Sequence, residues 1–330
     1  MRLRTRLRWM IEEHARHNGH ADVMREALDS LNGEQGAGEG RSGMTPAALG
    51  MVLTAAVLHA AWNLAAKRVR GDAAVFVWMY FTGSALLCVP LACWLMLAQG
   101  HVPGWETVLA PAVTAVFHIA YSVLLQLGYR HADLGIVYPV ARGVGPVLSV
   151  LVAVLLLGER PPALALLGGL LAVGGILVVT GRGLLHPSPG LGAGLLYGTL
   201  AGTGIAAYTL WDDFSVTALG VPPLIYFAAA CTAQSLLMLP WVIRRRAAVH
   251  PTWRADRRPV LIVSVLSPGA YVLVLYALQH ASVALVAPLR ESSIVIGALL
   301  AWWLFKEKEP APRILGAAVV ACGIVLVALG

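Results

Sequence analysis

Two adjacent charged residues, Arg290 and Glu291, interrupt an apolar stretch that runs from Val283 to Phe305. A charged side chain at the centre of a bilayer costs roughly 2.5–3.5 kcal/mol, so a chain that keeps one there pairs it inside the protein or uses it. Arg142 lies well inside another apolar stretch. Because Arg142 and Glu291 each lie about 12 Å along their stretches at 1.5 Å per residue, we expect them to form an ion pair, with Arg290 nearby.

This trio carries two positive charges and one negative charge. The surplus positive charge suits an anionic or zwitterionic small molecule, because an arginine grips a carboxylate or phosphonate through two parallel hydrogen bonds. The alternative is an ion pair that only fixes the packing of two helices. Glu291 is also a candidate proton carrier, but burial favours its protonated form and the arginines its charged form, so the sequence leaves proton coupling open.

Two prolines precede these charges at matching distances. Pro139 and Pro288 lie three residues before Arg142 and Glu291. Proline removes a backbone donor and frees carbonyl groups that can face a cavity. We therefore expect a helix break at both prolines.

Polar side chains at helical spacing supply further candidates for substrate binding. His59 and Asn63 are four residues apart with Trp62 beside them, and we expect this face to line a cavity because an unpaired amide is costly in hydrocarbon. His118 and Gln126 also share a helix face, and they either line the cavity or hydrogen-bond between helices. A metal site built on the two histidines is not favoured, because no carboxylate or cysteine stands at ligand spacing.

An aromatic pair ends the sixth apolar run. Tyr208 and Trp211 precede Asp212. Trp and Tyr are enriched at both membrane–water interfaces, so this group is predicted to be an interfacial belt rather than a substrate contact.

The composition is that of a polytopic membrane protein. Of 330 residues, 58% are hydrophobic and 12% charged, against about 25% charged in soluble domains. The net charge of +7 comes from basic clusters beside apolar runs, which is typical of membrane-protein loops rather than of nucleic-acid binding. Ten apolar runs are long enough to cross a ~30 Å hydrocarbon core, so we expect ten transmembrane helices. The runs are residues 46–66, 73–98, 107–128, 134–157, 163–181, 191–211, 222–243, 259–279, 283–305 and 312–329.

Residues 1–44 form a polar tail that differs from the rest of the chain. Apolar residues recur at helical spacing in its first part, and it lacks the apolar core of a secretory signal peptide. Two origins are considered: a surface helix, or sequence upstream of a natural start at Met44.

The apolar runs divide into two repeats of five, residues 45–188 and 189–330. The segment from His131 to Arg142 aligns with that from His280 to Glu291 at a constant offset. An odd number of spans per repeat forces the second copy to insert upside down, which predicts an inverted repeat with its binding site near the bilayer midplane. In the sixth span, glycines at every fourth position from Gly190 to Gly202 predict close approach of a neighbouring helix.

Several of these motifs together resemble the EamA-type transporters of the drug/metabolite transporter (DMT) superfamily. They are Tyr138-Pro139-Val140-Ala141-Arg142-Gly143, Ala287-Pro288-Leu289-Arg290-Glu291, His59-Ala60-Ala61-Trp62-Asn63, Gly158-Glu159-Arg160 and Lys306-Glu307-Lys308. The resemblance covers residues 45–330 and implies an all-α basket of ten helices around a central cavity. It also implies cytoplasmic termini, whereas the basic loops place the termini on the opposite side, so orientation stays open.

No enzyme signature is present, because the sequence has no Walker A loop, HExxH motif or nucleophile elbow. We predict a secondary active transporter in the plasma membrane that moves a small polar metabolite by alternating access, without a cofactor. The alternatives are a flippase for lipid-linked substrates on the same fold and, less favoured, an intramembrane enzyme. The expected partners are the small-molecule substrate and the lipid bilayer, with protons as an open addition and nucleic acid excluded. Monomer and homodimer both remain open.

Overall fold

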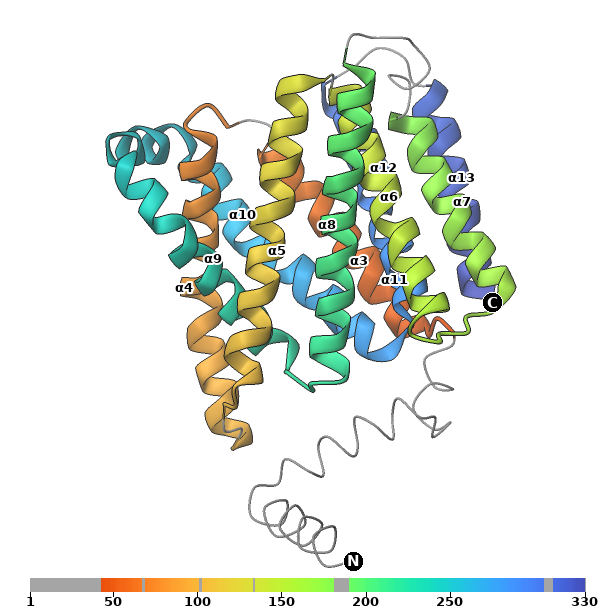
Figure 1. Cartoon of the computed structure of the whole chain (residues 1–330), viewed down its shortest axis with the longest axis horizontal. Coiled ribbons are helices and arrows are strands. Elements are labelled where there is room, and N and C mark those ends of the chain that lie inside the picture. The colour runs from red at the N-terminus through yellow and green to blue at the C-terminus, as the bar shows by residue number, and fades with distance from the viewer. Residues whose placement is uncertain are drawn as a thin grey trace, which may run out of the picture. The chain divides into compact units, whose positions relative to one another are not determined.

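The computed structural model describes residues 43–66, 69–100, 103–132, 134–180, 190–305 and 311–329, and within them every regular element is an α-helix (Figure 1). The expected all-α fold is therefore confirmed. The helices are α3 (Pro46–Ala66), α4 (Ala73–Gln99), α5 (Glu106–His131), α6 (Leu134–Leu155), α7 (Ala163–Thr180), α8 (Leu191–Thr217), α9 (Pro223–Arg244), α10 (Arg246–His280), α11 (Val283–Arg290), α12 (Ser292–Phe305) and α13 (Ala311–Leu329). The tail up to residue 42 and the turn Lys306–Lys308 lie outside the described residues.

These helices coincide with the ten expected spans, the ninth being divided between α11 and α12. In the described residues, six helices are long and apolar enough to cross a membrane, namely α3, α4, α5, α6, α9 and α10. Shorter apolar helices occupy the fifth and tenth spans. The sixth span, α8, is not among them because its glycines and polar residues lower its hydropathy.

The connection before the eighth span is helical, whereas the apolar run predicted for that span begins only at residue 259. Helix α10 begins at Arg246, and only Asp256 within it leaves helical geometry, with φ −123° and ψ 16°. The Asp256 carboxylate accepts hydrogen bonds from the backbone N–H groups of Arg70 (3.1 Å) and Gly71 (2.7 Å). These bonds attach the bend in α10 to the turn that follows α3.

The two predicted helix breaks have different outcomes. Helix α11 ends at Arg290, two residues after Pro288, and the Glu291 backbone N–H donates to the Pro288 carbonyl at 3.2 Å in a tight turn. In contrast, α6 continues through Pro139 as one helix, so the break predicted there is wrong. Pro139 lies near the start of α6. The carbonyl group that its missing N–H leaves without a partner is in the first turn, so the helix loses few of its hydrogen bonds.

The glycines of α8 allow it to lie directly against α6, as expected. A Cβ atom added at Gly198 would lie 2.8 Å from the Val140 Cβ and 3.0 Å from the Val137 carbonyl oxygen. At Gly202 it would lie 2.9 Å from the Ala141 carbonyl oxygen. Only glycine permits this separation, because real Cβ atoms do not approach other atoms so closely.

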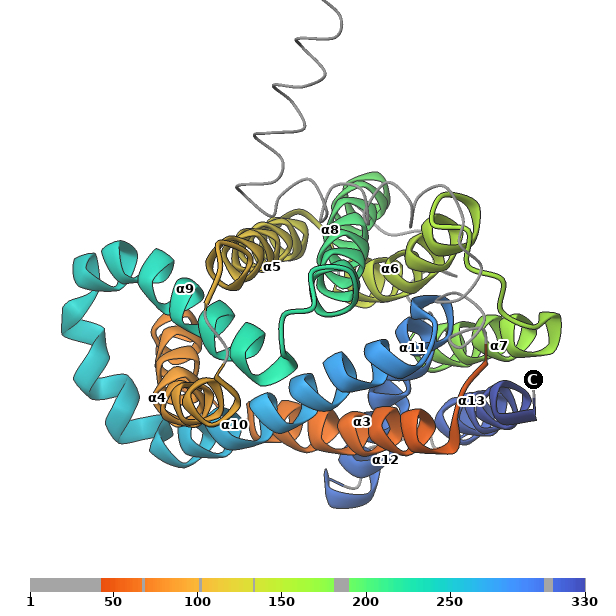
Figure 2. The ribbon, with the colours of Figure 1, turned by 90° about the horizontal axis from the view of Figure 1, so that it is seen from below.

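The two halves of the chain pack reciprocally. Helix α3 packs on α10, and their counterparts in the repeats, α8 and α5, pack on each other. Likewise α4 packs on α9 and α7 on α13, which pairs the second spans and the fifth spans of the two repeats. In Figure 2, α5, α8 and α6 form one side and α3 and α13 the other, with the end of α10 between them. Two repeats related by a twofold axis would pack in this way, and the inverted insertion of the second repeat remains a prediction.

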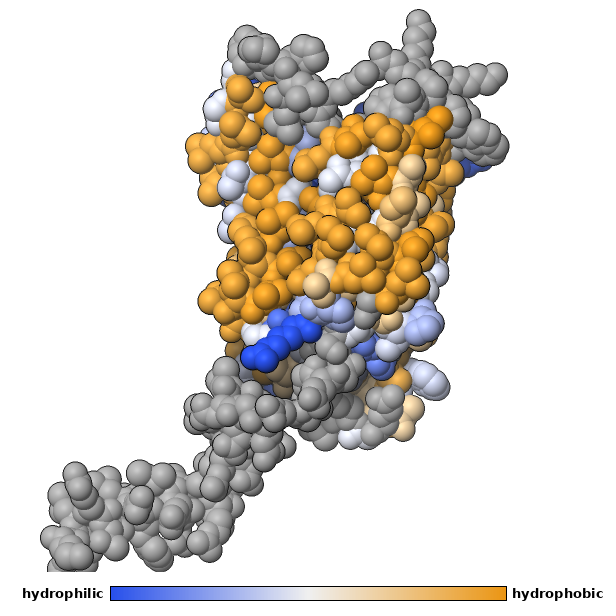
Figure 3. Space-filling model, turned by 90° about the vertical axis from the view of Figure 1, so that its right-hand side faces the viewer, coloured by the Kyte–Doolittle hydropathy of each residue, from blue (hydrophilic) through white to orange (hydrophobic). Residues whose placement is uncertain are grey.

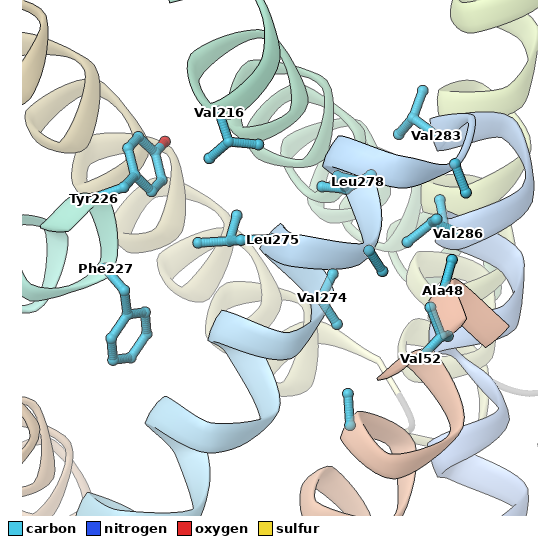
Figure 4. Close-up of a cluster of buried hydrophobic side chains, with 14 of the residues drawn as sticks. Ala48, Val52, Val216, Tyr226, Phe227, Val274, Leu275, Leu278, Val283 and Val286 are labelled. Carbon is cyan, nitrogen blue, oxygen red and sulfur yellow. The ribbon is translucent and has the colours of Figure 1, made fainter. Parts of the chain in front are cut away.

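A large cluster of buried apolar residues includes the end of α10 and the start of α11. Figure 4 shows Tyr226 and Phe227 of α9 beside Leu275, with Val283 and Val286 of α11 packed nearby. The outer surface is the reverse of a soluble protein, because large apolar side chains such as those along α6, α7 and α13 are exposed. Figure 3 shows these residues as a broad hydrophobic area with polar residues gathered at its lower end. This surface suits contact with lipid.

Candidate functional site

A cluster of three charges lies where α6 meets the junction of α11 and α12. Arg142 Nη1 donates to Glu291 Oε2 at 2.9 Å, and Arg290 Nη2 donates to Glu291 Oε1 at 3.2 Å. The Glu291 side chain is 1% exposed, whereas those of Arg142 and Arg290 are 19% and 12% exposed. The ion pair expected between Arg142 and Glu291 is therefore present, with Arg290 beside it.

The helix break after Pro288 positions the carboxylate of this cluster. Glu291 is the residue between α11 and α12, and its side chain contacts the middle of the continuous helix α6 through Arg142. Arg142 and Glu291 are 149 positions apart, which is also the offset at which the two repeats align. Matching positions of the two repeats thus meet at the ion pair.

Arg290 connects the cluster to α8. Its Nη2 lies 3.3 Å from the hydroxyl oxygen of Tyr208 and 3.4 Å from that of Thr209, and both oxygens accept hydrogen bonds from it. The guanidinium also lies 5.6 Å from the centre of the Tyr208 ring, within the range of a cation–π interaction. Arg142 has a similar aromatic neighbour, the Tyr138 ring, at 5.5 Å.

The cluster keeps the surplus positive charge that the sequence predicted. Both oxygens of Glu291 are engaged, one by each arginine. Each guanidinium has five N–H donors, so the described contacts leave donors on both arginines. A carboxylate or phosphonate group could bind Arg142 through two parallel hydrogen bonds while Glu291 stays paired with Arg290.

The three predicted residues of α3 lie close together, but their polar groups are used differently. The His59 and Trp62 rings pack edge to face with their centroids 4.7 Å apart. The Asn63 amide donates to the His59 carbonyl at 2.8 Å, and Asn63 is exposed. His59 lies within electrostatic range of Arg142 and Glu291, near the charged cluster.

The two predicted residues of α5 separate. His118 is partly buried and stacks on Tyr208 of α8, with ring centroids 4.0 Å apart. Gln126 is exposed, and its side chain makes no hydrogen bond with another described residue. His118 thus contacts neighbouring helices, and its role in substrate binding stays a prediction. The role of Gln126 in substrate binding stays a prediction.

Asp212 belongs to a second buried site that the sequence analysis missed. It is 2% exposed, and its Oδ1 accepts hydrogen bonds from Thr114 Oγ1 at 2.7 Å and from Tyr226 Oη at 2.6 Å. Its Oδ2 accepts a hydrogen bond from Tyr271 Oη. The apolar run of the sixth span ends before Asp212. Because no glycine or proline follows until Gly220, the sequence could have predicted that the helix continues past Asp212.

The predicted interfacial belt is accordingly wrong. Tyr208 is 6% exposed and lies between His118 and Arg290. The Trp211 indole N–H donates to the Ala110 carbonyl of α5 at 2.8 Å. Helix α8 continues to Thr217, so these two residues lie within the helix rather than at its end, and both side chains contact neighbouring helices.

A cavity of about 600 Å³ lies between the second half of α3 and the bent part of α10. Apolar residues of α3 line one part of it, and Arg70 together with three arginines, Asp256 and four apolar residues of α10 lines the rest. None of the residues predicted to bind substrate lines it. Across the part of the chain that the structure describes, no group of three or more His, Cys, Asp or Glu residues could hold a metal ion.

Comparisons with known proteins agree with this architecture. A sequence model of the EamA-like transporter family matches residues 46–181 and 192–329. No curated protein matches the chain. The crystal structure of a protein that is 18% identical aligns with a TM-score of 0.67, covering 86% of this chain and 98% of its own. At that identity the likeness concerns the fold alone.

Proposed function

The chain belongs to the EamA-like transporter family, and on that premise we propose that it is a secondary active transporter for a small polar metabolite that is anionic or zwitterionic. It works by alternating access in the plasma membrane and is not an enzyme. The family match supports a multi-pass membrane transporter. The charged cluster supports the substrate class.

The observation that carries this proposal is the charge balance of the cluster. Two arginines with partly exposed side chains share one carboxylate that is 1% exposed. A purely structural ion pair needs one cation for one anion. An uncompensated buried charge costs several kcal/mol, so the second guanidinium is better explained by an anionic ligand that completes the balance.

The geometry also suggests how binding and movement are linked. An anionic group bound to Arg142 competes with Glu291 for the same guanidinium, which loosens the contact between α6 and the α11–α12 junction. This junction is already interrupted after Pro288, so it can change its backbone angles with little loss of helical hydrogen bonds. Substrate binding would therefore act on a contact between the two repeats.

Flux into proteoliposomes tests this function. The purified protein is reconstituted, and uptake of radiolabelled amino acids, other carboxylates and phosphonates is measured. We expect at least one anionic or zwitterionic compound to enter, and we expect Arg142→Gln to abolish its uptake while Arg142→Lys keeps a small part, because lysine supplies charge without the two-pronged geometry.

Arg246→Gln is the matched control, since it removes an exposed arginine at the start of α10. It should transport as the unmodified protein does. Uptake that is unchanged in Arg142→Gln would refute the binding role of the cluster. Uptake restricted to cations would refute the substrate class.

A further inference from the structure

The second buried carboxyl, that of Asp212, differs from Glu291 in the kind of partner that holds it. Glu291 is paired with two arginines, which favour its charged form. Asp212 is hydrogen-bonded by the hydroxyl groups of Thr114, Tyr226 and Tyr271. Neither of its oxygens bonds an arginine or lysine among the described residues. A buried carboxyl with hydroxyl partners can exist with or without a proton, because each hydroxyl can donate or accept.

His118 extends this site by one hydrogen bond. Its Nδ1 lies 2.9 Å from the Thr114 carbonyl oxygen, which can only accept, so Nδ1 carries the hydrogen in the neutral ring. The other nitrogen, Nε2, is then an acceptor, and it lies 3.4 Å from the Tyr271 hydroxyl. The Tyr271 hydroxyl thus stands between two groups that can accept its hydrogen, Nε2 of His118 and the Asp212 carboxylate.

These contacts define a balanced protonation step. In the charged state, Tyr271 donates its hydrogen to Asp212 Oδ2. When one proton binds to Oδ2, the new O–H group donates to the Tyr271 oxygen, and the Tyr271 hydroxyl turns to donate to His118 Nε2. The carboxyl changes from −1 to neutral, no hydrogen bond is lost, and His118 stays neutral.

The site is connected to the arginine cluster by direct contacts. The His118 ring stacks on the Tyr208 ring at 4.0 Å, and the Tyr208 hydroxyl accepts a hydrogen bond from Arg290 at 3.3 Å. Arg290 in turn donates to Glu291. Protonation of Asp212 therefore reorients the Tyr271 hydroxyl that touches His118, and the His118–Tyr208 stack connects this change to Arg290.

We propose that Asp212, with Tyr271 and His118, forms a proton-binding site, and that its occupancy is coupled to anion binding by Arg142 and Arg290. The coupling rests on the proposed function, whereas the protonation of Asp212 does not. The site joins α5, α8, α9 and α10, so it lies at a meeting point of the two repeats.

Each helix that packs near Asp212 contributes a titratable or charged group. Helix α5 contributes His118, α9 contributes Tyr226 and α10 contributes Tyr271. Arg290 of α11 approaches through Tyr208. The neighbouring carboxyl Asp213 lies on α8 itself and is also buried, so the experiment has to distinguish the two.

Infrared difference spectroscopy during a pH titration of the purified protein measures this protonation directly. A protonated carboxyl has a C=O band that a carboxylate lacks. Exposed Asp and Glu carboxyls titrate near pH 4, so the titration is kept above about pH 5.5. Over that range we expect the unmodified protein to gain one such band, and we expect Asp212→Asn to lose it while Asp213→Asn and Glu291→Gln keep it. A band that disappears in Glu291→Gln or Asp213→Asn, or no band in the unmodified protein, overturns the proposal.

Tyr271→Phe keeps the proposal testable if Asp212→Asn does not fold. It retains the carboxyl but removes the hydroxyl between Asp212 and His118, so the band should persist with a shifted titration midpoint. An unshifted midpoint overturns the described role of Tyr271. In proteoliposomes with a transported substrate, Asp212→Asn should lose accumulation driven by a pH gradient. Accumulation that persists would refute the coupling without affecting the transport assignment.

Discussion

At the scale of single residues, the two buried carboxyls show what a sequence can and cannot reveal. Glu291 was recognisable because it interrupts a long apolar run, and its partner Arg142 followed from the repeat. Asp212 stands at the edge of a weakly apolar run, where hydropathy favours an interfacial position. Its three hydroxyl donors come from three other helices, and Thr114 and Tyr271 lie 98 and 59 positions away, so no local pattern brings them together.

Removal of the carboxylate in the charged cluster should destabilise the bundle. Glu291→Gln leaves the guanidiniums of Arg142 and Arg290 close together without a counter-ion. Removing one partner of a buried ion pair typically costs about 3–5 kcal/mol, and the partial exposure of both arginines favours the lower end. Thermal unfolding in detergent measures this loss. A melting temperature equal to that of the exposed control Arg246→Gln would show that the arginines are otherwise compensated.

Asp72, which precedes the membrane-spanning part of α4, should make the stability of the fold depend on pH. Burial raises its pKa, but hydrogen bonds from the backbone N–H groups of Val75 and Ala74 and from Arg245 outweigh this effect and hold the pKa below its ordinary value of 3.8. A pKa that is lowered in the folded state contributes stability that is complete above the ordinary, unfolded-state pKa. This stability is lost as the pH falls through the folded-state pKa. Asp72→Asn keeps a capping oxygen without the charge, so its melting temperature should fall less on acidification. Parallel acid titrations of the two proteins would contradict this.

At the scale of helices, most boundaries followed from the apolar runs, and the errors have physical causes. The start of α10 was missed because its first turns are basic and contain proline. By hydropathy alone, such a segment is predicted to be a loop. Its Asp256 and Thr252 side chains accept hydrogen bonds from the backbone N–H groups of Gly71 and Asp72, and these partners lie far away in the sequence. The break after Pro288 was predictable from proline alone, but the continuity of α6 at Pro139 was not.

The contact between α8 and α6 can be tested at one glycine. In Gly198→Ala the new Cβ would lie 2.8 Å from the Val140 Cβ, so the helices must separate. Such overpacking typically costs about 1–3 kcal/mol. Gly192→Ala on the same helix is the control, because a Cβ there meets nothing within 4 Å, and better helix propensity should leave stability equal or higher. If both variants unfold at the same temperature, close approach at Gly198 is not what holds α8 to α6.

At the scale of the whole molecule, the five-plus-five repeat predicted the pairing that brings the charges together. The motif offset placed Arg142 and Glu291 at matching positions, and the structure joins them. The reciprocal packing of α3 with α10 and α5 with α8 has the same origin. A repeat pattern cannot show which surface faces each side of a membrane. Orientation therefore depends on an experiment.

Inverted insertion of the second repeat predicts that equivalent turns face opposite sides of the membrane. The turn after α3 contains Arg70, and its counterpart after α8 contains Ala218, both exposed. Single cysteines at these positions are introduced after the native ones, Cys88, Cys93, Cys231 and Cys322, are replaced by alanine. Because five spans separate the two turns, a membrane-impermeant thiol reagent added to sealed vesicles of uniform orientation should label one cysteine and spare the other. Permeabilised vesicles should label both, which shows that each site is reactive. Labelling of both from the same side of sealed vesicles would mean that the repeats insert in parallel, and the meeting of Arg142 and Glu291 would then need an explanation other than an inverted repeat.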